Sequence, residues 1–98
     1  MSESPRRYLI AYDIKDDKRR SKVATYLQSF GDRIQYSVFI IDVRPSRLVR
    51  VDDELKNRIK LSEDRILICN LGLVGSITRD VFRFIGNSKE IEEGPIVL

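Results

Sequence analysis

The sequence contains no histidine, and this absence excludes several kinds of active site. Without an imidazole there can be no Ser-His or Cys-His nucleophile pair, no histidine-ligated metal and no imidazole acid–base catalysis. Any catalysis by this chain must therefore rest on carboxylates, lysine, tyrosine or a bound metal ion.

Cysteine and long apolar runs are also scarce. The one cysteine, Cys69, can form neither an intrachain disulfide nor a cysteine-based zinc site, which favours an intracellular protein. The longest apolar stretch, residues 66–74, is broken by Asn70 and Gly72 and falls far short of a membrane span. Residues 1–7 are polar and lack the apolar core of a signal peptide. We therefore expect a cytoplasmic protein with no membrane contact.

The composition is that of one folded domain. The 98 residues leave room for a single core, and 42% hydrophobic with 34% charged residues argues against disorder. Eighteen basic and fifteen acidic residues give a net charge of +3. This mild excess permits an anionic partner without requiring one, so the distribution of charge along the chain must decide.

The first apolar run, residues 8–14, is predicted to be a central strand that ends beside an acid. One of its faces carries Leu9, Ala11 and Asp13. A carboxylate at the end of an apolar face is costly unless it reaches solvent, a partner or a cation. Asp13 is therefore the first candidate for a functional residue.

A helix is predicted over residues 17–30, with Asp16 or Asp17 as its N-terminal cap and Gly31 as its stop signal. Three cations crowd its first turn: Lys18, Arg19 and Arg20. The helix macrodipole disfavours cations at that end, so their presence requires a reason.

Residues 32–43 alternate in the manner of a strand, and Phe39 and Ile41 lie on one side of it. Because no element of this short chain obviously covers that side, we expect another subunit to cover it. A ferredoxin-like order requires two strands between the helices. The segment has no internal turn signal, so one long bent strand remains an alternative.

The rest of the chain completes a two-layer α+β sandwich with both helices on one face of the sheet. We expect a structural helix from Pro45 to about Leu61, a buried strand over residues 65–71 and a short strand over 81–85. Residues 95–98 form a final apolar segment that needs a strand edge to pair with.

Two interpretations of the acidic residues remain open. Asp13, Asp16 and Asp17 can gather a hard cation, since Mg²⁺ is held by one or two carboxylates together with water and phosphate oxygens. Alternatively, the latter two cap the helix while Asp13 pairs with an arginine. A two-fold dimer that brings two copies of Asp13 together would supply a second ligand.

The basic residues also have two interpretations. The cations of the first helical turn, together with Lys22 and Arg33, can form a stripe that contacts phosphates, or they are simply a solvated helix face. The hydroxyl of Ser37 can hold a phosphate or a water molecule. Tyr12 and Tyr36 fit either the core or a surface on which a base stacks.

Three motifs carry a resemblance to a known family. They are Tyr12-Asp13-Ile14 at the end of the first strand, Asp16-Asp17-Lys18-Arg19-Arg20 at the helix start, and Arg33-Ile34-Gln35-Tyr36-Ser37-Val38-Phe39. With these motifs the chain resembles, over nearly its whole length, the small CRISPR-associated proteins numbered two.

The resemblance implies a single ferredoxin-like domain over residues 1–98, with a flexible N-terminus at 1–7 and a C-terminal loop and strand at 86–98. It implies a homodimer with stacked sheets, in which the C-terminal strand joins the partner's sheet. It further implies a nuclease dependent on Mg²⁺ or Mn²⁺ that cuts single-stranded RNA or double-stranded DNA during spacer acquisition. The alternative is a non-catalytic scaffold that bridges integrase subunits and holds DNA.

The resemblance also assigns roles to residues. Asp13 matches the metal-binding catalytic aspartate, contributed once by each protomer. The residues expected to support that cleft are Tyr12, Asp16, Ser37 and Phe39, and those expected to contact nucleic acid are Lys18, Arg19, Arg20 and Arg33.

Overall fold

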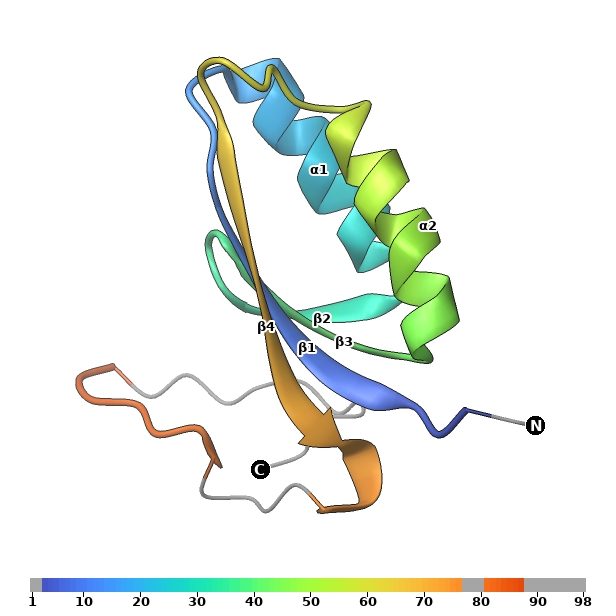
Figure 1. Ribbon diagram of the computed structural model, residues 1–98. Helices are drawn as coiled ribbons and strands as arrows, with labels where there is room; N and C mark the ends of the chain where they lie inside the picture. The colour runs from blue at the N-terminus through green and yellow to red at the C-terminus, as the bar shows by residue number, and fades with distance from the viewer. Residues whose placement is uncertain (1–2, 77–80, 88–98) are drawn as a thin grey trace.

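The computed structural model describes residues 3–76 and 81–87, which fold in the order βαββαβ (Figure 1). The strands are β1 (Arg6–Asp13), β2 (Gly31–Gln35), β3 (Val38–Val43) and β4 (Arg65–Leu73). The helices are α1 (Asp17–Gln28) and α2 (Pro45–Lys56), and a short 3-10 turn, Val74–Ser76, follows β4.

The four strands form one antiparallel sheet in the order β2-β3-β1-β4. Both helices pack on the same face of this sheet, so the molecule has two layers (Figure 1). This is the ferredoxin-like arrangement, and it confirms the predicted α+β sandwich. No helix within residues 3–76 and 81–87 is long and apolar enough to cross a membrane.

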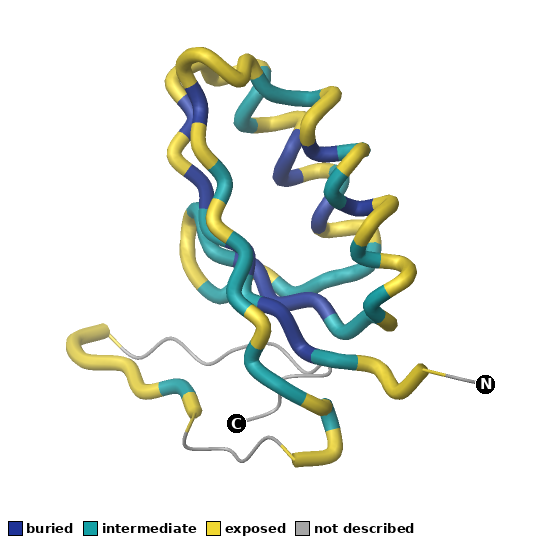
Figure 2. The backbone as a smooth tube through the Cα atoms, viewed as in Figure 1, coloured by how far each residue is buried: buried dark blue, intermediate teal, exposed yellow. Residues whose placement is uncertain are grey.

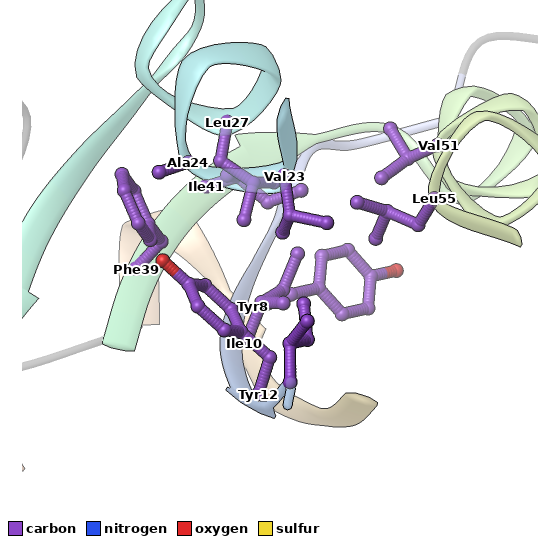
Figure 3. Packing of buried hydrophobic residues seen from close by; sticks show 11 residues of the cluster. Tyr8, Ile10, Tyr12, Val23, Ala24, Leu27, Phe39, Ile41, Val51 and Leu55 are labelled. Atoms are coloured by element: carbon purple, nitrogen blue, oxygen red, sulfur yellow. The ribbon is translucent and has the colours of Figure 1, made fainter. Parts of the chain in front are cut away.

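The core lies between the sheet and the helices, where alternate residues of β1 meet the apolar stripes of α1 and α2 (Figure 3). Tyr8, Ile10 and Tyr12 point toward the helices because alternate residues of a strand share a face. Figure 2 shows the buried positions concentrated on the facing sides of the two layers. The helical contributors are Val23, Ala24, Leu27, Val51 and Leu55.

Residues 32–43 are two strands and not one long bent strand, because the chain reverses at Tyr36 and Ser37. The turn lacks local glycine or proline and is held instead by β1. The Tyr12 amide donates to the Ser37 carbonyl at 3.1 Å, and the Tyr12 hydroxyl donates to the Tyr36 carbonyl at 3.5 Å. A turn stabilised by a distant strand leaves no local sequence signal.

The prediction that Phe39 and Ile41 lie on an uncovered face is wrong. They stand opposite Ile10 and Tyr8 of β1, so they face the helices and are 0% and 1% exposed. The turn at residues 36–37 and an irregularity between Arg33 and Gln35 set this register. The sheet face away from the helices carries instead Leu9, Val38, Ile40, Leu67 and Cys69.

Gly31 does not stop α1, which already ends at Gln28 with Ser29 as its C-terminal cap. It is the first residue of β2, and its φ is not positive. A Cβ at this position would lie 2.6 Å from the Ile41 Cγ2 methyl and 2.8 Å from the Ile40 carbonyl oxygen. The glycine is needed because β2 approaches β3 closely here.

Gly31→Ala should therefore destabilise the fold by about 1–3 kcal/mol, since the new methyl group overlaps a backbone oxygen that cannot rotate away. The free energy of unfolding from urea titrations measures the effect. Gly75→Ala is the matched control, because a Cβ at that position meets no atom within 4 Å. Equal stability of the two variants would contradict this explanation of Gly31.

Several element boundaries also differ from the predictions. β1 begins at Arg6, and Arg7, expected in a flexible N-terminus, is buried and paired with Asp42 at 2.7 Å. α2 ends at Lys56 and does not continue to Leu61. Residues 81–85 form no strand, because an alternating segment becomes one only when an edge pairs with it. Most of the expected C-terminal strand, residues 88–98, lies outside the described residues.

Candidate functional site at the end of the first strand

Asp13 is the last residue of β1 and is exposed. It lies where α1 is about to begin, in register with Arg65 at the start of β4. Within residues 3–76 and 81–87 its carboxylate forms neither a hydrogen bond nor an ion pair, although Arg65 is its neighbour. The predicted pairing of this acid with an arginine is therefore not formed, and its oxygens are available to a ligand.

The neighbouring carboxylates, by contrast, are already bonded. Asp16 caps α1 by accepting from the Arg19 amide at 3.0 Å, and this hydrogen bond lowers the pKa of the Asp16 carboxyl. Asp17 pairs with the guanidinium of Arg20. Among the residues that the structure describes, no three potential ligands gather around a metal position. The aspartates therefore do not form one cluster, and Asp13 stands alone.

One of the cations in the first turn of α1, Arg19, has a structural explanation in Asp64. The Asp64 side chain is fully buried and accepts from the Arg19 guanidinium at 2.7 and 3.1 Å. It also accepts from the backbone amides of Lys60 at 2.8 Å and Lys15 at 3.1 Å. These bonds, the one from Arg19 above all, hold the pKa of the Asp64 carboxyl well below its usual range. Asp64 thus joins three segments of the chain next to Asp13.

Arg20 is likewise bonded within the fold, since its guanidinium donates to the Ile14 carbonyl at 2.6 Å as well as to Asp17. Lys18 is exposed on the same turn. The contacts of these residues with nucleic acid remain predictions. The structure adds that Arg19 and Arg20 also support the loop that follows Asp13.

Arg33 lies over aromatic rings next to this end of the sheet. Its guanidinium carbon is 5.1 Å from the centre of the Phe39 ring and 5.6 Å from that of Tyr36. Phe39 in turn stacks on Tyr12 with ring centres 6.3 Å apart. Because Phe39 is completely buried, it supports this region from beneath and does not line a cleft.

The surface above this stack is a small hollow lined by Asp17, Arg20, Ser21, Ala24, Arg33 and Tyr36. Tyr36 is 70% exposed, so its ring is available to a ligand. Ser37 lies in the β2–β3 turn, where its carbonyl accepts a hydrogen bond from the backbone amide of Tyr12, the residue before Asp13. The structure therefore joins Tyr12 and Ser37 directly before Asp13, and it places Arg33 and Tyr36 together with residues of α1 in the lining of the hollow.

Asp64 is not among the residues that the sequence analysis identified as functional. Its signal was indirect: an acid stands directly before a buried strand, and basic residues sit unexplained at a helix N-terminus. Each observation calls for a partner of opposite charge. Neither observation specifies which residue is the partner, so the ion pair itself is seen only in the structure.

One exposed carboxylate beside several cations suits the binding of a hard cation together with a phosphate. Mg²⁺ is usually held by one or two carboxylates, with water and phosphate oxygens completing its shell. Asp13 has the oxygen donors that such an ion prefers, and no competing partner within the described residues. The chain therefore fits a divalent cation as the contributor of one carboxylate.

Comparisons with known proteins match the same region. A protein of Rhodospirillum rubrum named CRISPR-associated endoribonuclease Cas2 4 is 50% identical over 62 residues, 63% of this chain and 50% of that protein. The chain thus spans half the length of this curated relative.

Two solved structures share the fold. The Cas2 structure from Streptococcus pyogenes has a TM-score of 0.70 and 27% identity, and the match covers 82% of this chain and 99% of that one. A chain of a partial Cas6-RT-Cas1–Cas2 complex has a TM-score of 0.61 and 34% identity, with coverage of 67% and 73%.

The family model described as CRISPR associated protein Cas2 matches residues 6–73, from the first residue of β1 to the last of β4. This range contains Asp13, its neighbours and the whole sheet. The chain belongs to the CRISPR-associated protein Cas2 family.

Proposed function

We propose that this protein is a divalent-metal-dependent endonuclease that hydrolyses phosphodiester bonds of single-stranded RNA or double-stranded DNA in spacer acquisition. The observation that carries the proposal is Asp13, an exposed carboxylate at the end of a central strand that has no partner among the described residues. The Rhodospirillum rubrum relative is named an endoribonuclease, and this name supports the proposed class of reaction.

The described residues around Asp13 position its backbone and form no bond to its carboxylate oxygens. β1 is paired with β3 and β4, and the amide of Tyr12 is bonded to the β2–β3 turn, so the backbone is fixed up to the site. Mg²⁺ or Mn²⁺ bound there would stabilise phosphate charge and activate a water molecule. Lys18, which is exposed in the first turn of α1, would attract the nucleic acid and hold its phosphates. Arg33 is exposed on β2 and would add positive charge on the side of the sheet that faces α1.

A second copy of the chain would supply the second carboxylate. We infer that two protomers meet through the sheet face away from the helices, where Leu67 is 53% exposed and lies near Cys69 and Leu9. An exposed apolar sheet face of this kind favours the association of two copies of the chain. In a two-fold dimer each copy contributes the same residues to the contact.

Cleavage by the purified wild-type protein, titrated with Mg²⁺ and with Mn²⁺, tests the proposal. We expect labelled single-stranded RNA or duplex DNA to be cut only when metal is present, and cutting to stop with a chelator. Absence of cleavage of both substrates at every metal concentration would exclude the nuclease.

A second candidate is a non-catalytic scaffold that bridges integrase subunits and holds DNA. It is supported by the likeness to a chain of a complex that contains Cas1 and Cas2, and by the finding that no three potential metal ligands gather among the residues that the structure describes. Pull-down with Cas1 subunits, followed by a spacer-acquisition assay, separates the two functions. A scaffold forms the complex and supports acquisition even when Asp13 is replaced by asparagine.

A further inference from the structure

A second charged surface lies at the other end of the sheet, at the N-terminus of α2. A hollow there is lined by Phe30, Val43, Arg44, Ser46, Arg47 and Arg50, with Pro5 and Asp42 at its border. We call it the α2 groove. α2 begins two residues after Val43, which pairs with Arg6, so the groove lies at the opposite end of β1 from Asp13. Seven strand steps separate these ends by about 23 Å.

The α2 groove carries three arginines in a row. Arg44, the N-cap residue of α2, and Arg47 and Arg50 within the helix are spaced three residues apart, line the same groove and are all exposed. Within residues 3–76 and 81–87, none of their side chains has an ion-pair partner. Asp42 at the border is already bonded to Arg7 through both carboxylate oxygens. The groove is therefore a local excess of positive charge.

A carboxylate from a distant part of the chain is bound in this groove. Arg44 at the N-cap makes no side-chain hydrogen bond to α2, and the first turn contains no acid, so among the described residues the usual local partner of the first amides is missing. The amide of Ser46 donates instead to Glu3 Oε1 at 3.2 Å, 43 residues away in the sequence. Hydrogen bonds from Ser46 lower the pKa of the Glu3 carboxyl, with Arg44 acting in the same direction.

We propose that the α2 groove is a second binding site for the phosphates of a nucleic-acid strand, and that Glu3 occupies it as an internal competitor. The carboxylate and a phosphate use the same partners, a helix N-terminal amide and guanidinium groups. The inference rests on the proposed function only in that its ligand is nucleic acid. It needs no metal and no residue of the Asp13 site.

The spacing of the arginines favours a polyanion over a single phosphate. The row from Arg44 to Arg50 is about 9 Å long, because six residues of helix rise by that distance. A free phosphate group contacts only one or two guanidinium groups at a time. Successive phosphates along one strand of a duplex are about 3.4 Å apart along the axis, so the row spans two or three nucleotides. A strand contacting both the α2 groove and Asp13 would bridge about seven nucleotides at the same rise.

The test is binding of an oligodeoxythymidylate of about ten nucleotides to the whole protein, in chelator and over a range of salt concentrations. Arg44→Gln combined with Arg47→Gln should weaken binding and reduce the salt slope by about 0.7 for each lost contact. Glu3→Gln should tighten binding about two- to fivefold, because the competitor is neutralised. The matched control is Lys56→Gln, at the other end of the same helix.

The backbone amide resonance of Ser46 reports directly on the site. We expect the oligonucleotide to shift it and inorganic phosphate, at an equal phosphate concentration, to leave it unchanged. An equal shift by inorganic phosphate would overturn the polyanion assignment. If the double arginine variant has the same salt slope as Lys56→Gln, the α2 groove is not a phosphate site. If Glu3→Gln binds with wild-type affinity, Glu3 is not a competitor.

These results are independent of the nuclease. If the protein never cleaves RNA or DNA with Mg²⁺ or Mn²⁺ while the arginine substitutions weaken binding, the α2 groove is supported and the nuclease proposal is contradicted. If cleavage depends on Asp13 but the arginine substitutions leave both affinity and salt slope unchanged, the nuclease stands and the α2 groove fails.

Discussion

Asp13→Asn should lower the rate of metal-dependent cleavage by about a hundredfold or more. The asparagine keeps the size of the side chain but removes the negative charge that a divalent cation requires. A metal ion stabilises the transition-state charge of phosphoryl transfer by several kcal/mol, and each 1.36 kcal/mol corresponds to about a tenfold change in rate. Initial cleavage rates at several metal concentrations measure the loss.

The fold should be unaffected by this substitution, because the carboxylate of Asp13 makes no hydrogen bond or ion pair with the rest of the described chain. Asp53→Asn, which neutralises an exposed carboxylate of α2, is the matched control and should cleave at the wild-type rate. Thermal unfolding confirms that both variants are folded. Wild-type cleavage by Asp13→Asn would remove this residue from the mechanism, even if the protein proved to be a nuclease.

Asp64→Asn should be the most destabilising single polar substitution near the site. It removes the charge that pairs with Arg19 and places a neutral amide at the buried position of the carboxylate, beside a guanidinium that is partly exposed. Breaking one partner of a buried ion pair is strongly destabilising, and we expect the melting temperature to fall by at least about 10 °C. Glu63→Gln, which removes only the exposed ion pairs of Glu63 with Arg19 and Lys60, is the control and should change the melting temperature little.

The effect of Asp64 should depend on pH in a defined direction. Its pKa is lowered in the folded protein, so the unfolded chain binds the proton more readily. Its stabilisation is therefore complete well above the unfolded pKa of about 4 and is lost as the pH falls below that value. Unfolding titrations at neutral and acidic pH should show the wild type and Asp64→Asn converging in stability. A difference that stays constant down to strongly acidic pH would contradict the ion-pair explanation.

The sequence predicts the elements whose signals are local. β1, α1 and the first part of α2 follow from the periodicity of their apolar residues, and the cap at Asp16 follows from its residue type. The turn at Tyr36 and Ser37 escapes prediction because Tyr12, more than twenty residues away, holds it. The face assigned to Phe39 and Ile41 was wrong for the same reason, since the turn sets the register of β3.

The candidate site likewise contains residues with a local sequence signal and residues without one. Asp13 can be found from the sequence because an acid at the end of an apolar strand is locally unusual. The partners of Arg19 cannot be found in that way, since Asp64 is 45 residues distant and belongs to a different loop. The α2 groove was overlooked because the apolar stripe of the helix accounts for its packing, and the arginines lie outside that stripe.

The pairing of β1 on both sides also has an entropic consequence for Asp13. Its main chain belongs to a ladder with β4, and the preceding residue is tied to the β2–β3 turn, so the backbone is ordered before any ligand arrives. Only the side-chain torsions of the aspartate remain to be fixed. Fixing the backbone of one residue costs about 1–2 kcal/mol, and a ligand that has to order several loop residues loses that amount of binding free energy for each of them. A cation at Asp13 would meet a preorganised site and lose little of its affinity to ordering the protein.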